Sequence, residues 1–450
     1  MVARLRPGIQ RTSDSLSNLA HSFHEHWITR ALLRLRHVRK GSAAINSMLI
    51  GSSAALGLPV LYLGGLTVGA AFGSVAAARR ARATLTCRPL TKFLVLIPAH
   101  DEEAVIARLL QSTDNLSYPP DLIDLRVVAD NCSDRTVEIA HEFGVAVMER
   151  VDIMSPGKGA ALNWAVRAVS DEKPTYDAVV FIDADSVVDP SFLIAMDTRF
   201  RNGSAAVQGF YGVLDPDISA AVALRFAALA CRHHLRPLGR TQFGASSGLY
   251  GNGMAFRRDL IESRQWSSHL IEDAEFQLEL LLSGTLVHYE PAARLHAEMP
   301  DSFDRARTQH QRWEKGRIQV LRTHLPKLVR SSIRHSGGSV ATIDAAFDLA
   351  VPPMSVLAGG VSGAAAVSAL INLVAPSATR RFCTTCFLIM NAVVGAHVLV
   401  GLRLSHAPRS VYKSLASAPR LLIWKLRLLA QMGRNDRTVD WVRTQRNAAK

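Results

Sequence analysis

The sequence predicts an α/β domain with a mostly parallel sheet, accompanied by helices that cross a membrane or lie on its surface. Two observations support the domain. Between Phe93 and about Glu290 short apolar runs alternate with helical patterns, and polar residues directly follow several of those runs. A third observation indicates the membrane, because long stretches without any charged residue lie on both sides of this segment. With 450 residues the chain is long enough for more than one unit.

The elements of this segment follow one another as strand, helix, strand, helix. Strands are expected at Phe93–Ile97, Ile123–Ala129, Val145–Met148 and Ala178–Ile182. Helices are expected from the turn at 98–103 through Leu110, from a cap at Asp134 through Phe143, and from Gly157-Lys158-Gly159 to about Val169. This order favours a parallel sheet, and open parallel sheets bind ligands at the carboxyl ends of their strands. The residues that fall at such ends are Asp101, Asp130, Lys158, Asp183 and Asp185.

Asp183 and Asp185 lie two positions apart, directly after an expected strand. Positions i and i+2 of an extended backbone project to the same side, so the two carboxylates can face one point. At about 4 Å and an effective dielectric constant of roughly 20 they repel by about 4 kcal/mol, which a divalent cation would reverse. The pair therefore indicates Mg²⁺ or Mn²⁺, with a nucleotide diphosphate as a further ligand. The alternative is a solvated turn, after which Asp189-Pro190 begins the next helix.

Three uncharged stretches predict a membrane protein: Ala44 to Ala78, Leu349 to Val374 and Cys383 to Leu402. The first is long for one span and short for two, so a single tilted helix and a re-entrant hairpin are both open. The other two are joined by the short link 376–381 and predict a helical hairpin. No cleavable signal peptide is expected, because some forty mostly polar residues precede the first apolar stretch.

The net charge of +14 is placed for a membrane surface and not for nucleic acid. Eleven Lys or Arg residues lie between Arg403 and Lys450, interleaved with Leu, Ile and Trp, which is typical of a basic amphipathic segment on anionic lipid. Another basic cluster precedes the first apolar stretch. The five cysteines form no disulfide framework, and the spacing of Cys383 and Cys386 is attributed to packing. So few cysteines fit a catalytic domain in a reducing cytoplasm.

Several motifs occur in order along the chain: Ile97-Pro-Ala-His-Asp-Glu-Glu103, Asp130-Asn-Cys-Ser-Asp134, Gly157-Lys-Gly-Ala-Ala-Leu-Asn163, Asp183-Ala-Asp185, Gly251-Asn-Gly-Met254, Ile271-Glu-Asp273 and Gln309-His-Gln-Arg-Trp313. Together they resemble the membrane-bound family-2 glycosyltransferases, the group that includes cellulose, chitin, hyaluronan and poly-N-acetylglucosamine synthases. The resemblance covers half of the chain, from Phe93 to about Arg317. It implies a GT-A (Rossmann-like) fold, a nucleotide-sugar donor that is usually a UDP-sugar, a divalent metal, and inversion at the anomeric carbon.

The resemblance assigns the nucleotide to the strand ends. Asp130 would accept the imide proton of a uracil, and Lys158, between two glycines, would meet the base or a phosphate. Asp185 would hold the metal, with Asp183 near the ribose or sharing the metal. His100, Asp101 and Glu102 would line the first strand end, although the resembling proteins more often carry Asn where Asp101 stands. The competing interpretations are a turn residue for Asp130 and a solvated loop lysine for Lys158.

The resemblance assigns the chemistry to two helices. Asp273, beside Glu272, would be the base that takes the proton of the acceptor hydroxyl, unless it only complements a helix dipole. Ile271 stands where relatives have Thr. Gln309, Arg312 and Trp313 share one helix face and would reach the diphosphate and the acceptor sugar, unless they anchor a membrane-surface helix. Further expectations are that Gly251-Asn252-Gly253 lines the acceptor site and that His233 and His234, pointing about 100° apart, lie on the surface.

We therefore expect a metal-dependent, inverting glycosyltransferase of the cell (inner) membrane that passes the membrane several times and has its catalytic domain in the cytoplasm. It would use a glycan or lipid-linked acceptor in polysaccharide or glycolipid synthesis, processively or by single additions. The alternative is a catalytically inactive membrane scaffold of the same fold. Membrane lipids are expected partners, nucleic acid is not, and a homo-oligomer is left open. The expected parts are a basic N-terminal amphipathic region at 1–43, transmembrane segment(s) at 44–78, a GT-A domain at 91–300, interfacial helices with the Gln-x-x-Arg-Trp motif at 301–335, a transmembrane hairpin at 346–404 and a basic amphipathic tail at 405–450.

Overall fold

The computed structural model describes residues 42–79, 88–172, 175–267, 269–334 and 340–434. Nearly all of the expected N-terminal basic region and the last sixteen residues of the basic tail lie outside the described residues. The chain divides into two compact units, one of Met1–Gly57 with Val361–Ile389 and one of Leu58–Gly360 with Met390–Lys450. The sheet and the candidate site belong to the second unit.

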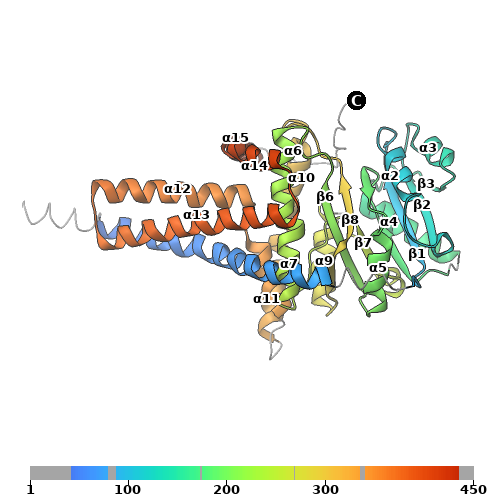
Figure 1. The fold of residues 1–450 in the computed structure, drawn as a ribbon, viewed down its shortest axis with the longest axis horizontal. Helices are drawn as coiled ribbons and strands as arrows, with labels where there is room; N and C mark the ends of the chain where they lie inside the picture. Colours follow the sequence, from blue (N-terminus) through green and yellow to red (C-terminus); the bar gives the residue numbers. More distant parts are fainter. Residues whose placement is uncertain (1–41, 80–87, 173–174, 268, 335–339, 435–450) are drawn as a thin grey trace, which may run out of the picture. The chain divides into compact units, whose positions relative to one another are not determined.

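The described part of the second unit contains one eight-stranded sheet (Figure 1). Its order is β3-β2-β1-β4-β7-β6-β8-β5. The pairs β1–β2, β1–β4, β2–β3 and β6–β8 are parallel, and the pairs β4–β7, β6–β7 and β5–β8 are antiparallel. The strands are β1 (Phe93–Ala99), β2 (Ile123–Asp130), β3 (Ala146–Arg150), β4 (Ala178–Phe181), β5 (Ser186–Val188), β6 (Ala206–Val213), β7 (Met254–Arg257) and β8 (Val287–Ala297).

The expected α/β fold with a mostly parallel sheet is confirmed. The four strands expected from the apolar runs appear as β1, β2, β3 and β4, each within two residues of the expected ends. They form the fully parallel half of the sheet, so the carboxyl ends of these strands meet at one edge. The second half is mixed, because β7 enters between β4 and β6 in the opposite direction.

Helices cover both faces of the sheet. Successive residues of β1 alternate between two cores: Phe93, Val95 and Ile97 pack with α2 and α5, whereas Leu94 and Leu96 pack with α4 and α9. A central strand that is buried on both faces reads as a continuous apolar run, as β1 does. The elements of this layer are α2 (Ile106–Thr113), η1 (Pro120–Leu122), α3 (Thr136–Glu142), α4 (Lys158–Asp171), α5 (Phe192–Arg201), α6 (Ala220–Leu229), η2 (Ala230–Leu235), α7 (Arg236–Gln242), α8 (Arg258–Glu262) and α9 (Glu272–Leu282).

The helix expected after Asp134 is present as α3, but its N-cap is Arg135 and not Asp134. Asp134, one residue earlier, still accepts at Oδ1 a hydrogen bond from the backbone N–H of Thr136 at 2.9 Å. The same oxygen also accepts from the Thr136 hydroxyl at 2.5 Å. Residues Lys158 to Asp171 form the helix expected after the two glycines, and Phe192 begins the helix expected after Asp189-Pro190. Local signals in the sequence therefore placed these helix starts to within about two residues.

The helices beyond the sheet begin with α10 (Arg307–Arg334) and α11 (Val340–Ala350). Leu278 and Leu281 of α9, Val320 and Leu328 of α10, and Ala345 of α11 share one apolar core. This core fixes α10, which carries the Gln-x-x-Arg-Trp motif, against α9, which begins with Glu272 and Asp273. The chain continues through α12 (Met354–Val374), α13 (Ala378–Leu404), α14 (Arg409–Ser414), η3 (Leu415–Ser417) and α15 (Ala418–Arg434).

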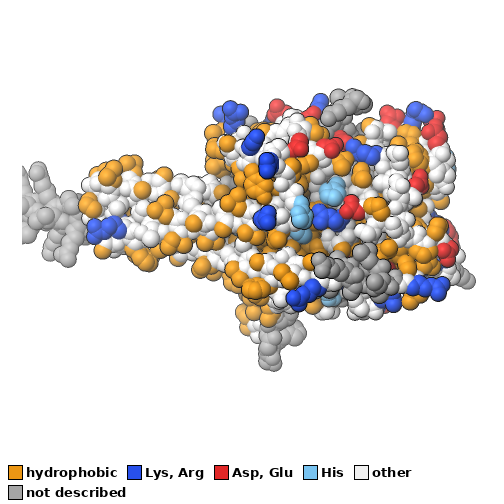
Figure 2. Space-filling view, viewed as in Figure 1, with side chains coloured by type: hydrophobic (Ala, Val, Ile, Leu, Met, Phe, Trp, Pro, Cys, Tyr) orange, Lys and Arg blue, Asp and Glu red, His pale blue; other side chains and the backbone are white. Residues whose placement is uncertain are grey.

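Three helices in the described residues are long and apolar enough to cross a membrane: Ser42–Arg79, α12 and α13. Ser42–Arg79 is continuous, which favours the single tilted helix over the re-entrant hairpin. Leu61 of this helix is 74% exposed and Leu373 of α12 is 80% exposed. In Figure 2 the surface over α12 and α13 is mostly orange and white, and the red Asp and Glu side chains lie over the sheet and the helices beside it. Such apolar surfaces are suited to lipid.

Candidate active site

The acidic pair lies in the short turn between β4 and β5. This turn is tied to the loop 251–253, because the backbone N–H of Asp183 donates to Asn252 Oδ1 at 3.0 Å and Asn252 Nδ2 donates to Ser186 Oγ at 2.8 Å. Asn252 is fully buried. Gly251 and Gly253 on either side have φ of 76° and 67°, a left-handed conformation that glycine adopts without strain. The Gly-Asn-Gly motif thus positions the acidic turn.

Lys158 joins the start of α4 to this turn. Its ammonium donates to Asp183 Oδ1 and to the carbonyl oxygen of Gly251. The side chains of Lys158 and Asp183 are 22% and 31% exposed, so this contact can be reached from solvent. Burial opposes the charge of the ammonium, but the carboxylates of Asp183 and Glu272 hold the pKa of Lys158 above its ordinary value. Lys158 is therefore a charged, structured residue and not a solvated loop lysine.

Glu272 and Asp273 bring the first turn of α9 to the same place. A Cβ atom on Gly251 would lie 3.2 Å from Asp273 Oδ2 and 3.7 Å from Lys158 Nζ. Burial together with the charge of Asp273 raises the pKa of Glu272 to about 7, and burial also raises the pKa of Asp273. Carboxylates with raised pKa values in a site are suited to proton transfer near neutral pH. The structure thus gathers Lys158, Asp183, Glu272 and Asp273, which are spread over more than a hundred positions of the sequence.

The end of β1 is engaged mainly with the loop after β2. His100 Nδ1 lies 2.7 Å from the carbonyl oxygen of Asp130. Asp101, at a φ of 54°, accepts from the backbone N–H of Ser133 at 2.7 Å. Burial alone would raise the pKa of Asp101, but this hydrogen bond and its neighbours lower it below its ordinary value. The backbone N–H of Glu102 donates to Thr136 Oγ1 at 2.7 Å. These contacts give His100, Asp101 and Glu102 a clear role in joining two strand ends.

Asp130 ends β2 in a buried ion pair that the sequence analysis missed. Arg150, the last residue of the neighbouring strand β3, donates from Nη1 to Asp130 Oδ1 at 2.5 Å, and the two side chains are 6% and 8% exposed. Arg150 also donates to Asp152 Oδ2 at 2.7 Å. The pairing of Asp130 with Arg150 in register explains the contact. Asp130 is thus held rigidly at the strand end, whichever ligand group it meets.

Gln309 and Trp313 of α10 meet Arg225 of α6. Arg225 Nη1 donates to Gln309 Oε1 at 2.7 Å, Nη2 lies 2.9 Å from His310 Nε2, and its guanidinium carbon lies 5.7 Å from the centre of the Trp313 ring. Burial and the charge of Arg225 keep the pKa of His310 well below its ordinary value, so His310 can accept this hydrogen bond. Arg225 is a further residue of the site that the sequence analysis missed.

Arg312 lies on the same helix but interacts electrostatically with Glu272 at the start of α9. Its charge helps to lower the pKa of Glu272 against the stronger effects of burial and Asp273. Arg312 Nε is buried and has no hydrogen-bond partner among the described residues. At Gly316 a Cβ atom would lie 2.8 Å from the side chain of Ile271, so the absence of a side chain lets α10 approach the start of α9. The Gly of the Gln-x-x-Arg-Trp-x-x-Gly spacing therefore has a packing reason.

An aromatic stack joins β6, η2 and the loop before β7. His233 lies between Tyr211 and Tyr250, with ring centroids 5.0 and 4.1 Å away and ring planes within 30°. Burial, and after it the charges of Asp185 and Asp183, raise the pKa of Tyr211. The expectation that His233 and His234 lie on the surface is wrong: they are 7% and 5% exposed. The angle between neighbouring helix residues correctly predicts that the two imidazoles point in different directions. Both are nevertheless covered, His233 by Tyr211 and Tyr250 and His234 by Tyr289.

The acidic turn is suited to a divalent cation whose remaining coordination positions are filled by a bound diphosphate and by water. Asp183 and Asp185 offer carboxylate oxygens at a strand end, and the contact of Asp183 with the Lys158 ammonium shows that this point attracts positive charge. Within the described ranges no cluster of three or more His, Cys, Asp or Glu ligands includes this pair. Mg²⁺ and Mn²⁺ sites of this kind use one or two carboxylates and take their other ligands from phosphate and water. The residues therefore fit such an ion together with a diphosphate.

The C-terminal amphipathic helix α15 contacts α10 beside the site. Lys425 donates to Glu314 at 2.7 Å, with side-chain exposures of 7% and 8%. The ring of Trp424 packs edge-on against the ring of His310, with centroids 5.2 Å apart, and stacks on the ring of Phe303, with centroids 5.4 Å apart. His310 in turn contacts Arg225. A chain of direct contacts therefore leads from α15 to Gln309.

Lys425→Met is expected to lower stability and turnover together. Breaking a buried ion pair by removing one partner costs about 3–5 kcal/mol when the remaining charge is left uncompensated, whereas an apolar pair of similar volume can be neutral. Arg317 Nε, 3.5 Å from Glu314 Oε2, offsets part of this cost. Lys425→Met with Glu314→Leu should therefore recover most of the thermal midpoint that Lys425→Met loses. Thermal unfolding and donor turnover of both variants measure this. A single variant as stable and active as the parent would show that α15 does not support the site.

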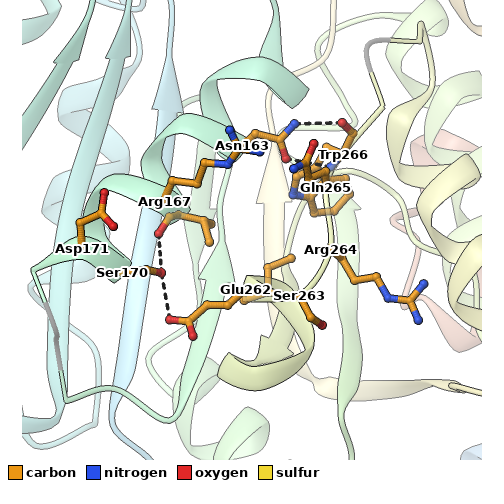
Figure 3. Close-up of a pocket in the computed structure, with 11 residues that line it drawn as sticks. Asn163, Arg167, Ser170, Asp171, Glu262, Ser263, Arg264, Gln265 and Trp266 are labelled. Carbon is orange, nitrogen blue, oxygen red and sulfur yellow. Dashed lines mark hydrogen bonds between the residues drawn. The ribbon is translucent and has the colours of Figure 1, made fainter.

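One pocket of the described residues lies elsewhere, between α4 and α8 (Figure 3). It has a volume of about 290 Å³, and its lining includes Asn163, which exchanges hydrogen bonds with the backbone of Trp266 at 2.8 and 2.9 Å. Ser170 donates to Glu262 on its other side at 2.9 Å. None of the expected site residues lines this pocket. This pocket is therefore separate from the residues at the strand ends.

Comparison with protein families finds one match. The model of the family described as Glycosyltransferase like family 2 matches residues 89–316, which is half of the chain. This range includes β1 to β8 and the first residues of α10 through Gly316. It therefore contains each of the motifs from Ile97 to Trp313.

Curated relatives are similar over the same region. The chain is 28% identical over 244 residues to a probable glycosyltransferase, YdaM, of Bacillus subtilis, covering 52% of this chain and 57% of the relative. It is 28% identical over 186 residues to the beta-monoglucosyldiacylglycerol synthase of Trichormus variabilis, covering 40% of this chain and 38% of the relative. The chain thus spans about half the length of the curated relatives it matches.

Among solved structures, the mannosyltransferase PcManGT from Pyrobaculum calidifontis, in complex with GDP-Man and Mn²⁺, is 20% identical with a TM-score of 0.48. The alignment covers 79% of this chain and 98% of that chain. Glucosyl-3-phosphoglycerate synthase from Mycobacterium tuberculosis is 23% identical with a TM-score of 0.36, covering 50% of this chain and 77% of that chain.

Proposed function

Because this chain belongs to glycosyltransferase family 2 and is a glycosyltransferase of the α/β, GT-A type, we propose that it transfers a sugar from a UDP-sugar to a glycan or lipid-linked acceptor, with inversion, at the cytoplasmic face of the inner membrane. The observation that carries the proposal is the meeting of Asp183, Glu272 and Asp273 around the ammonium of Lys158. The end of β4 and the start of α9 thereby present carboxylates to one point. A solvated turn or a charge that only complements a helix dipole would not require this convergence.

Asp273 is proposed as the base. Inversion by direct displacement needs a group that takes the proton of the acceptor hydroxyl on the face of the sugar opposite the leaving diphosphate. Asp273 lies partly buried beside Gly251, burial raises its pKa, and its Oδ1 accepts from the backbone N–H of Ala274 at 2.8 Å, which fixes its orientation. Glu272, whose pKa is raised to about 7 by burial and by Asp273, supports the same region.

Asp183 and Asp185 are proposed to hold a Mg²⁺ or Mn²⁺ ion. When bound, such an ion stabilises negative charge that develops on a leaving diphosphate. Lys158 is placed to exchange its contact with Asp183 for a phosphate oxygen, since its ammonium has three donors and a flexible stem. Asp130, held by Arg150, and the segment His100 to Glu102 are proposed to bind the nucleoside at the neighbouring strand ends.

Gln309, Arg312 and Trp313 are proposed to complete the donor and acceptor site from α10. Arg225 fixes Gln309 and approaches Trp313, and Arg312 lies within electrostatic reach of Glu272. Trp313 offers an aromatic face of the kind on which sugar rings stack. Three apolar helices long enough to span a bilayer, together with relatives named beta-monoglucosyldiacylglycerol synthase, support a multi-pass enzyme with an acceptor at the membrane.

The proposal is tested by donor hydrolysis with the purified chain in detergent. UDP-glucose, UDP-N-acetylglucosamine and GDP-mannose are each supplied with Mn²⁺, with Mg²⁺ and with a chelator. We expect release of UDP from one UDP-sugar, dependent on the divalent ion and accelerated by added membrane lipid. Release of GDP alone would contradict the proposed donor. Equal release in the chelator would contradict the proposed metal.

A further inference from the structure

A polar cluster lies inside the apolar contact between α9 and α10. Leu278 and Leu281 of α9 pack against Val320 and Leu328 of α10. Beside this core, Glu275 and Glu279 of α9 face His324 of α10, and one ligand atom from each of the three lies within 4.8 Å of the others. None of these three residues belongs to the site described above. Their placement in an otherwise apolar interface calls for a physical reason.

His324 is the unusual member of this cluster. It is 1% exposed, and its Nδ1 lies 2.9 Å from the hydroxyl oxygen of Thr323. Its Nε2 is buried and has no hydrogen-bond partner among the described residues. Leaving a buried polar atom unpaired costs about 1–3 kcal/mol. This nitrogen points at Glu275 Oε1 from 4.0 Å, which is too long for a hydrogen bond but leaves room for an atom that both could bind.

Glu275 is held so that one of its oxygens faces His324. Its other oxygen, Oε2, accepts from the hydroxyl of Ser267 at 2.6 Å and lies 2.5 Å from Nδ1 of His269. Glu279 follows one helical turn later, so its carboxylate lies on the same face of α9. Glu275 is 7% exposed, whereas Glu279 is exposed and can swing toward the cluster from the solvent side.

We propose that Glu275, Glu279 and His324 bind one Zn²⁺ ion that fastens α9 to α10. One imidazole nitrogen and two carboxylate oxygens are ligands that Zn²⁺ takes at about 2.0–2.2 Å, and a water molecule completes a tetrahedral set. Small rotations of the side chains shorten the present separations to such distances. The ion would balance two carboxylates beside an apolar core, and Ser267 and His269 would hold Glu275 from behind, as outer groups commonly hold metal ligands.

This site is distinct from the proposed donor site. The donor's ion would be held by Asp183 and Asp185 in the turn after β4, whereas the second ion would lie between two helices. Because α9 begins with Glu272 and Asp273 and α10 carries Arg312, the second ion would fix the spacing between these residues. That consequence for activity rests on the proposed function, but the binding of Zn²⁺ does not.

The test measures Zn²⁺ alone, without nucleotide, on the full-length chain in detergent. The parent protein carries Asp183→Asn and Asp185→Asn, so ions at the donor site do not contribute. Into it are introduced His324→Ala, Glu279→Gln and, as matched controls at exposed positions of α3, His141→Ala and Glu142→Gln. Zinc retained after dialysis is measured by elemental analysis, and affinity by competition with a zinc-binding dye. Thermal unfolding is followed with and without Zn²⁺.

We expect one Zn²⁺ ion per chain in the parent and in both controls, and at least tenfold weaker binding in His324→Ala and Glu279→Gln. Zn²⁺ should raise the thermal midpoint of the parent and the controls, but not of the two ligand variants. If His324→Ala fails to fold, Glu279→Gln decides the matter, because Glu279 is exposed. Absence of retained zinc in the folded parent, or equal binding in parent and Glu279→Gln, would overturn the proposal. Failure of donor turnover with intact zinc binding would count only against the proposed function.

Discussion

Replacing Asp273 by Asn is expected to lower sugar transfer by about 10²–10⁴-fold, the range by which a positioned base accelerates a reaction. The amide cannot take a proton from the acceptor hydroxyl, but it has nearly the same shape and can still accept from the N–H of Ala274. Donor binding should therefore change little, so kcat should fall far more than KM rises. Steady-state kinetics with the donor identified by the hydrolysis screen measure both quantities.

The control for this variant is Asp259→Asn. Asp259 is also an acid in the first turn of a helix, α8, but its side chain is 64% exposed and pairs with Arg257 on the surface. Loss of a favourable charge at a helix N-terminus costs about 0.3–1 kcal/mol and acts on stability alone. If both variants retained turnover within a few fold of the parent, Asp273 would be only a helix-dipole charge, and the proposed base would be wrong.

Replacing Asp185 by Asn is expected to have the second large effect. The amide removes one of the two negative charges from the turn after β4, so a divalent ion binds less tightly and the diphosphate leaves with less stabilisation. Losing one group that stabilises developing charge lowers kcat by about 10²–10³-fold. The loss should be partly offset at high Mn²⁺ concentration, which a Mn²⁺ titration of donor hydrolysis measures.

Asp114→Asn provides the matched control, since Asp114 is an exposed residue just after α2 and away from the strand ends. Both variants should insert in the membrane and unfold at the parent's temperature, because Asp185 is only partly buried. Turnover of Asp185→Asn that equals the parent's at every Mn²⁺ concentration would show that this carboxylate does not hold the ion.

The parallel half of the sheet could be predicted because its signals are local. Apolar runs such as Phe93 to Ile97 become strands buried on both faces, and the strand ends then follow from the order of the elements. The convergence of Lys158 and Asp183 follows from the same topology, because α4 connects β3 to β4. The start of α4, with Lys158, and the end of β4, with Asp183, therefore both lie at the carboxyl edge of the parallel strands. The proximity of Asp273 was expected from the resemblance alone, as nothing local in the sequence sets the path from β7 to α9.

Partners from distant segments could not be predicted. Arg150 meets Asp130 because of a strand register, and Arg225 meets Gln309 because its long side chain reaches from α6 to α10. Neither relation leaves a signal in the sequence around it. His233 and His234 were placed wrongly for the same reason: their burial depends on Tyr211, Tyr250 and Tyr289, which other elements supply. Spacing along a helix determines directions, but packing determines what lies there.

Electron paramagnetic resonance of Mn²⁺ tests most directly whether the carboxylates at the end of β4 hold the donor's cation. It monitors the binding of Mn²⁺, with and without UDP, to the wild-type chain and to the variant with Asp183→Asn and Asp185→Asn. Free Mn²⁺ has a six-line signal that weakens as the ion binds. With wild-type protein, UDP should strengthen the loss of signal, and the double variant should need at least tenfold more Mn²⁺ for the same UDP-dependent loss. The same UDP-dependent loss in both proteins would contradict this site.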